Sequence, residues 1–161
     1  MTPLIKTAGY ALQQGAVIAS DAVGDMIGTS MPYADSQFLQ PDYLGKVLTQ
    51  YSVEELASPV SLASVSALDI RSTSSNCNNV VVQLEYNNKS DLPEQLFIKL
   101  PMPELGTRWF FGVIESWQLE SYFCRHVAPH VPLRTPKTYA THSQGTRFFL
   151  AQENLHLDPE V

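Results

Sequence analysis

One lysine and one glutamate in this sequence have the types and positions that suit binding of a nucleoside triphosphate. Lys99 follows the apolar residues Leu96-Phe97-Ile98, and Glu120 lies further along the chain in a segment with helical periodicity. Transfer of a phosphoryl group from ATP needs positive charge against the phosphates and a carboxylate that holds this charge in place. Lys99 and Glu120 are therefore candidates for a phosphate-binding ion pair. Taken alone, Lys99 is more typical of a lysine that keeps the rim of a sheet soluble.

The histidines do not combine into a metal site or a catalytic triad. His126 and His130 have the H-x3-H spacing of some zinc ligands, but Pro129 lies between them and no second pair of ligands follows. Ser121 and His126 lack the orienting acid and the oxyanion site that a nucleophile needs. We therefore predict no metal ligands and assign no catalytic residue in this sequence.

The composition limits the classes of partner. Of the 161 residues 44% are hydrophobic, which is enough for a folded core, and the formal charge of -6 gives no basis for nucleic-acid binding. No apolar segment approaches the roughly 20 residues that cross a bilayer, so we expect no membrane partner. Cys77 and Cys124 form no CxxC motif, which predicts neither a disulfide framework nor a thiolate zinc site. We expect a cytoplasmic protein with reduced thiols.

The sequence divides into an N-terminal extension, residues 1–40, and a domain, residues 41–161. The extension has few charges and a loosely helical spacing that glycines interrupt, and its sequence indicates no function. From Pro41 onward, apolar residues at i, i+3, i+4 and i+7 predict a short helix. These residues are Leu44, Val47, Leu48 and Tyr51.

Alternating apolar residues predict five strands in the domain. The predicted strands are 60–70, 80–86, 95–100, 137–142 and 147–152. The segment 72–79, rich in serine and asparagine, is expected to be the loop between the first two strands. The last two strands are expected to form a hairpin around Gly145.

A long helix is predicted between the third and fourth strands. Thr107 can cap it, and it should run from Arg108 until Pro129 prevents its continuation. At 100° per residue its apolar stripe consists of Phe110, Val113, Trp117 and Cys124. The aromatic residues of this segment, Trp109, Phe110 and Trp117, are predicted to lie in the core.

The helical wheel separates two glutamates of this helix. Glu120 flanks the apolar stripe beside Trp117 and should face the sheet. Glu115 lies roughly 160° from Trp117 and should face solvent. Because the third strand and the helix must pack together, we predict that Lys99 and Glu120 come within ion-pair distance.

Four short motifs follow one another in an order known from one group of kinases. They are Phe97-Ile98-Lys99-Leu100-Pro101, Glu120-Ser121-Tyr122-Phe123, Pro136-Lys137-Thr138-Tyr139-Ala140 and Glu153-Asn154-Leu155. The second is like an E-x-F-Y motif, and the fourth is like an E-D-L motif. In this order and spacing, residues 42–155 resemble the N-terminal lobe of the aminoglycoside phosphotransferase and choline kinase superfamily, nearest its ecdysteroid-kinase-like branch.

The resemblance implies a protein-kinase-like N-lobe of the α+β class. Such a lobe would have a five-stranded, mostly antiparallel sheet with one long packed helix, here with an N-terminal helical extension. The resemblance also implies ATP as the cofactor: Lys99 would contact its phosphates, Glu120 would pair with Lys99, and main-chain groups of Glu153 and Leu155 would hold adenine. Mg²⁺ would accompany ATP, with its ligands in a catalytic lobe.

Two departures from the family pattern shape the expected function. The sequence contains no H-G-D-x-x-x-x-N catalytic loop, and the predicted loop 72–79 contains no glycine where many relatives bring the backbone close to phosphate. We therefore expect the ATP-binding half of a small-molecule kinase that phosphorylates a hydroxyl acceptor, truncated before its catalytic lobe and inactive as this chain alone. The alternative is a noncatalytic interaction module, or a gene fragment with a degenerate kinase-like lobe, in which Lys99 and Glu120 are only a structural ion pair.

Overall fold

A single antiparallel sheet of five strands organises the molecule. The computed structural model describes residues 3–27, 35–71 and 77–155. The strands are β1 (Leu62–Arg71), β2 (Cys77–Tyr86), β3 (Gln95–Pro101), β4 (Thr138–Gln144) and β5 (Arg147–Glu153). They are hydrogen-bonded in the order β1-β2-β3-β5-β4, and every neighbouring pair is antiparallel. The predicted α+β class and five-stranded sheet are confirmed.

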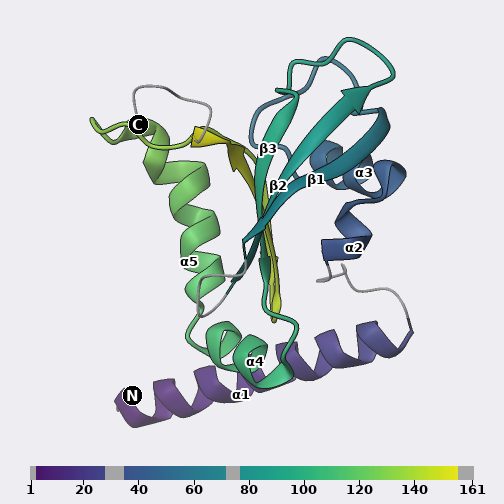
Figure 1. Ribbon diagram of the computed structural model, residues 1–161. Coiled ribbons are helices and arrows are strands. Elements are labelled where there is room, and N and C mark those ends of the chain that lie inside the picture. The colour runs from purple at the N-terminus through teal and green to yellow at the C-terminus, as the bar shows by residue number, and fades with distance from the viewer. Residues whose placement is uncertain (1–2, 28–34, 72–76, 156–161) are drawn as a thin grey trace.

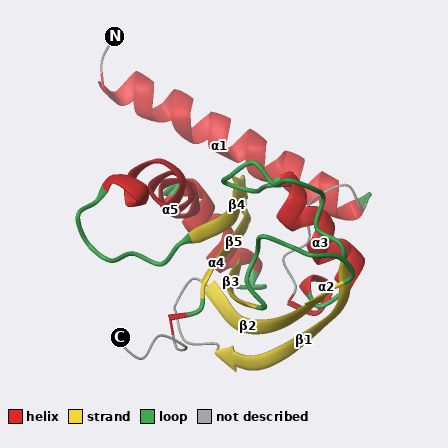
Figure 2. Cartoon of the chain, turned by 90° about the horizontal axis from the view of Figure 1, so that it is seen from above, coloured by secondary structure: helices red, strands yellow, loops and turns green. Residues whose placement is uncertain are grey.

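Helices lie on both faces and at one end of this sheet (Figure 1). They are α1 (Pro3–Met26), α2 (Asp35–Phe38), α3 (Pro41–Gln50), α4 (Leu105–Val113) and α5 (Ser116–Tyr122). Figure 1 shows α2 and α3 on one side of the sheet and α5 on the other. Helix α1 passes across one end of the molecule, where it contacts α4. Figure 2 shows that α1 extends past the sheet on the side of the N-terminus.

The prediction of one continuous helix over 108–129 is wrong, because the chain breaks at Ile114 and Glu115. Glu115 has a φ of 55°, the left-handed region, and it separates α4 from α5. Neither residue is a glycine or a proline, so the break has no marker in the local sequence. The helices on the two sides of the break make different contacts: a Cβ on Gly112 of α4 would lie 3.1 Å from the carbonyl oxygen of Gly145 in the β4–β5 turn, whereas α5 contacts the strands β4 and β5.

Further details of the predicted helix also differ from the structure. Helix α4 begins at Leu105, with Glu104 rather than Thr107 at its N-cap. Trp109 and Phe110, which were predicted to lie in the core, are 51% and 53% exposed. After α5 the chain continues through a π-helical turn (Phe123–Val127) and a 3-10 turn (Ala128–His130). These turns contain Pro129, so the predicted end of the helical segment is close to the observed one.

The predicted loop 72–79 also requires correction. Residues 77–79 lie inside β2, where Cys77, Asn78 and Asn79 pair with Pro101, Leu100 and Lys99 of β3. The two asparagines are polar, so residues 77–79 lack the apolar alternation that indicates a strand. This part of β2 is defined instead by its pairing with β3. The remainder of the predicted loop, 72–76, lies outside the described residues.

The main hydrophobic core lies between α3 and the sheet. Alternate residues of a strand point to opposite faces, so Leu96, Ile98 and Leu100 of β3 enter this core together. Helix α3 contributes Leu44, Val47 and Leu48 of the predicted apolar stripe, and the fourth residue, Tyr51 at the C-cap, is partly buried against this core. The same alternation turns Lys99 of β3 toward the opposite face, where α5 lies.

Candidate functional site

The predicted ion pair between Lys99 and Glu120 is present in the structure. The Nζ atom of Lys99 lies 2.5 Å from Oε1 of Glu120, and the two side chains are 21% and 28% exposed. Lys99 pairs with Asn79 of β2 and with Leu150 of β5, so it occupies the middle of the sheet and not a rim. The pair is therefore central in the sheet, and both of its side chains remain partly accessible to solvent.

Helix α5 is held against the sheet on both sides of Glu120 in the sequence. Trp117 is fully buried and stacks on Phe148, with ring planes 8° apart and centroids 6.1 Å apart. Ser121 and Thr141 share a hydrogen bond of 2.9 Å between their hydroxyl groups. Because residues three and four apart share one face of a helix, these contacts direct Glu120 toward β3.

A polar layer that the sequence did not reveal adjoins this pair. The Nε2 atom of Gln152 donates a hydrogen bond to Thr138 Oγ1 at 3.1 Å and lies 3.7 Å from Cys124 Sγ. Burial raises the pKa of the Cys124 thiol and the charge of Glu120 raises it further, whereas Lys99 lowers it. The thiol therefore lies within the electrostatic reach of the pair. Strand alternation predicts that Gln152 lies on this face, but nothing else in the sequence indicates its contacts with Thr138 and Cys124.

Glu153 and Leu155, the residues expected to hold adenine, lie at the end of β5. Carboxylate oxygens of Glu153 accept hydrogen bonds from Arg134 at 2.8 and 3.0 Å, and its backbone N–H donates to the carbonyl of Lys137. The hydrogen bond from Arg134 holds the pKa of Glu153 below its ordinary value. Since this side chain and this N–H are engaged within the protein, a nucleotide contact at Glu153 would use its carbonyl oxygen.

The register of the sheet fixes the separation between the two parts of the candidate site. Lys99 pairs with Leu150 and Leu96 pairs with Glu153, so Glu153 lies three residues along the ladder from Lys99. At about 3.4 Å per residue this separation is roughly 10 Å. The structure therefore brings Lys99 and Glu120 together, and it places Glu153 and Leu155 at a distance along the same strand pair.

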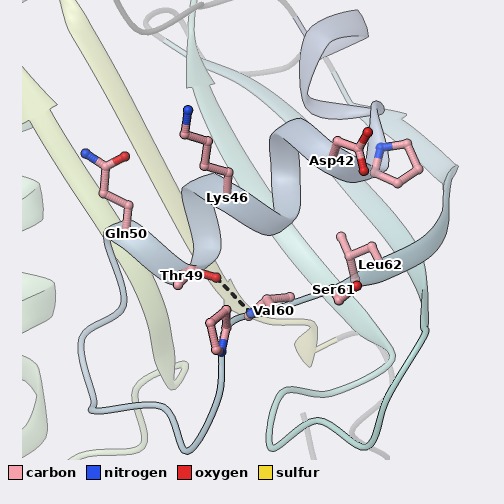
Figure 3. A pocket seen from close by; sticks show the side chains of 9 residues that line it. Asp42, Lys46, Thr49, Gln50, Val60, Ser61 and Leu62 are labelled. Atoms are coloured by element: carbon pink, nitrogen blue, oxygen red, sulfur yellow. Dashed lines mark hydrogen bonds between the residues drawn. The ribbon is translucent and has the colours of Figure 1, made fainter.

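A pocket elsewhere in the molecule does not include the ion pair. It has a volume of about 430 Å³ and lies between α3 and the segment 59–62, with Asp42, Lys46 and Ser61 in its lining. Figure 3 shows Thr49 among the lining residues, where the backbone N–H of Val60 donates to Thr49 Oγ1 at 2.8 Å. This pocket therefore belongs to the α3 side of the molecule.

The described residues contain neither a cluster of three or more metal-ligating side chains nor a helix long and apolar enough to cross a membrane. No family model matches the chain, and the comparisons with curated proteins and with solved structures gave no match. Any assignment of function therefore depends on the geometry of the residues themselves.

Proposed function

We propose that this chain is the ATP-binding lobe of a small-molecule kinase of the aminoglycoside phosphotransferase and choline kinase kind. The ion pair between Lys99 and Glu120 is the observation that carries the proposal. It joins the third strand of an antiparallel sheet to the helical segment that follows this strand, which is the arrangement that the resemblance implies. Such a pair presents a fixed positive charge to phosphate groups.

The proposed nucleotide lies along β3 and β5. Lys99 contacts the phosphates, while Glu120 holds the ammonium group in place at low entropic cost. Adenine lies at the end of β5, against the carbonyl of Glu153 and main-chain groups of Leu155. The separation of roughly 10 Å along the ladder suits a ligand with a flat base at one end and phosphates at the other.

The proposal assigns the chemical step to a catalytic lobe, which would carry the H-G-D-x-x-x-x-N motif. Mg²⁺ would arrive with ATP and would neutralise charge on its phosphates, held by carboxylates of that lobe. The acceptor is a hydroxyl group of a small molecule, and the lobe that orients this hydroxyl sets its identity. The proposed location is the cytoplasm, where ATP is available and where the cysteine thiols of Cys77 and Cys124 would remain reduced.

Calorimetric titration with ATP and Mg²⁺ tests the proposal. The parent chain should bind ATP, and Lys99→Ala should weaken binding about tenfold or more, which corresponds to about 1.4 kcal/mol. Lys46→Ala is the matched control, because Lys46 is an exposed lysine on the opposite side of the sheet. Adenosine, which lacks phosphates, should bind the parent and Lys99→Ala equally. Absence of ATP binding by the parent, or equal ATP affinity in Lys99→Ala, would overturn the proposal.

Activity measurements test the division of labour between the lobes. The purified chain should transfer no phosphate to amino-alcohol, aminoglycoside or steroid acceptors, because general base catalysis and metal binding are assigned to the other lobe. Turnover that Lys99→Ala abolishes would show that this chain carries its own catalytic carboxylate. Turnover that Lys99→Ala leaves unchanged would identify a contaminating kinase.

A noncatalytic interaction module is the second candidate, and exposed apolar side chains favour it. Trp109 and Phe110 of α4 are half exposed, and Leu119 and Tyr122 of α5 are 63% and 62% exposed. Apolar patches of this kind mark interaction surfaces. This candidate predicts no nucleotide binding in the titration above, together with a change in association state on Trp109→Ser, measured by light scattering.

A further inference from the structure

The N-terminal helix contacts the residue at which α4 and α5 separate. Gln14 is only 7% exposed, and its Nε2 atom donates a hydrogen bond of 2.9 Å to Oε1 of Glu115. Glu115 is the residue with left-handed backbone geometry, and the carbonyl oxygen of Glu115 accepts the bond from the N–H of Leu119 that begins α5. A side chain of α1 is therefore hydrogen-bonded to the residue that directly precedes α5.

The same helix also contacts the turn between β4 and β5. The carboxylate of Asp21 accepts hydrogen bonds from the backbone N–H and the hydroxyl of Thr146, and its Oδ1 atom lies 3.5 Å from Nε of the buried Arg147. A Cβ on Gly145, which has a φ of 57°, would lie 3.0 Å from Val17 of α1. Helix α1 therefore has a second attachment, to the β4–β5 hairpin of the sheet, in addition to its contact with Glu115 between α4 and α5.

The β4–β5 turn in turn contacts α4 and α5. Arg108 of α4 donates to Thr146 Oγ1 at 3.0 Å, and Gln118 of α5 donates to the carbonyl of Gly145 at 3.4 Å. Three helices and one turn therefore meet around Thr146 and Glu115. Figure 1 shows α1 passing beneath α4 at this end of the sheet.

The position of α5 determines whether Glu120 reaches Lys99. Glu120 lies five residues beyond Glu115, which is roughly 7.5 Å along the helix axis. A rotation of α5 by 10–20° about Glu115 would move the Glu120 carboxylate by roughly 1 to 3 Å. Such a movement is enough to break a hydrogen bond of 2.5 Å between these side chains.

We propose that α1 is a positioning element for the ion pair: through Gln14 it fixes Glu115, and thereby it holds Glu120 against Lys99. The consequence for ATP rests on the proposed function, whereas the consequence for the ion pair does not. Gln14 and Glu115 are positioning residues in this scheme, because neither contacts Lys99. The proposed function of the N-terminal extension, for which the sequence indicates none, is therefore to position this ion pair.

The test compares two adjacent glutamines in the full chain. Gln14→Leu removes the hydrogen bond and keeps the volume of the side chain, while Gln13→Leu changes an exposed glutamine on the same helix. Gln14→Leu should raise amide exchange in residues 116–122 and acylation of Lys99 by about threefold to tenfold, the range that corresponds to one hydrogen bond. Lys89, in an exposed loop, is the internal standard for acylation. Gln13→Leu should change neither quantity.

A merely structural role would give a different pattern. Loss of general stability would raise exchange throughout β2 and β3, whereas the proposal confines the increase to residues 116–122 of α5. If Gln14→Leu does not fold, Glu115→Gln and Glu115→Ala provide the same test, because only the glutamine variant retains an acceptor for Gln14. Exchange and acylation within twofold of the parent in Gln14→Leu, or in Glu115→Ala where the first variant does not fold, would overturn the inference.

ATP affinity separates this inference from the proposed function. In Gln14→Leu it should fall by a factor similar to the rise in Lys99 acylation. If acylation and exchange rise but the parent itself binds no ATP, the positioning role stands and the proposed function fails. If the parent binds ATP and Gln14→Leu changes neither exchange, acylation nor affinity, the proposed function stands and the positioning role fails.

Discussion

The two faces of the sheet differ in what they bury. Toward α3, fifteen buried hydrophobic residues of the described part of the chain form one continuous cluster. Toward α5, the buried cluster among the described residues is smaller, with Cys77, Trp117, Cys124, Phe148 and Leu150, and the ion pair and the hydrogen bond of Gln152 lie on the same face. Since the same strands supply both faces by alternation, one face stabilises the fold and leaves the other free to carry a polar site.

Two adjacent phenylalanines of β5 provide the strongest test of this comparison. Phe149 stacks on Phe38 in the large cluster, and Phe148 stacks on Trp117 in the small one. Phe149→Ala should lower the free energy of unfolding by about 3–5 kcal/mol, because the close-packed α3 face leaves a cavity that cannot collapse. Phe148→Ala should cost less, since the smaller and more open cluster can relax. Denaturant unfolding measures both, and a larger cost for Phe148→Ala would reverse the assignment of the two faces.

Neutralising the ion pair should affect stability far less than removing a core phenylalanine. Glu120→Gln keeps the shape of the side chain and removes its charge. Because both members of the pair are partly exposed, the free energy of unfolding should fall by about 1 kcal/mol or less, and added salt should reduce this difference. Thermal unfolding at low and high salt measures the change. A loss of 3 kcal/mol or more would mean that the pair behaves as a buried structural bridge.

A histidine at the edge of the α3 face should make that face sensitive to acid. Burial lowers the pKa of His142, which stacks on Tyr51 at 4.0 Å. As the pH falls below the ordinary value of 6.5, the unfolded chain takes up a proton that the folded chain accepts only at lower pH, so the free energy of unfolding should decrease. His142→Phe retains the ring and should flatten this dependence between pH 6.5 and 5. An unchanged slope would show that His142 is freely protonated in the folded state.

The smallest expected effect is that of Arg134 at the end of the sheet. Its hydrogen bonds lower the pKa of Glu153, so the pair stabilises the fold above the ordinary pKa of 4.5, and this contribution is lost as the pH falls through the lower folded value. Arg134→Gln should cost about 0.2–1 kcal/mol at pH 7, because Arg134 is half exposed, and nothing at pH 2. Urea unfolding at the two pH values measures this. An equal loss at both would indicate that packing, and not charge, is responsible.

The sequence predicted the helices and strands that bury one face, because burial of one face produces a regular spacing of apolar residues. Helix α3 and the strands showed their periods of 3.6 and 2, because each presents one face to the core. The contact between Lys99 and Glu120 was predictable for the same reason, since strand alternation and the helical wheel decide which way each side chain points. For helices and strands that pack in layers, the spacing of apolar residues in the sequence therefore indicates which side chains face one another.

The elements that the sequence did not predict depend on contacts from distant residues. Glu115 has no local feature that favours a left-handed backbone, and its bond to Gln14 joins residues 101 positions apart. Helix α1 runs through Gly9 and Gly15, which were expected to interrupt the helical spacing of this segment. A glycine in a helix costs about 1 kcal/mol relative to alanine, which tertiary contacts can offset.

The irregularities of β1 have a consequence for how copies of this protein meet. Strand β1 lies at one edge of the sheet, and its pairing with β2 shifts register between Leu62 and Ser64 and again between Ala67 and Asp69. At the other edge, the backbone of residues 51–53 bonds to Tyr139 and Thr141 of β4. An irregular strand and a covered strand are both poor templates for edge-to-edge association, which in a regular edge strand leads to aggregation. Substitutions that straighten β1 should therefore promote fibril formation before they impair folding.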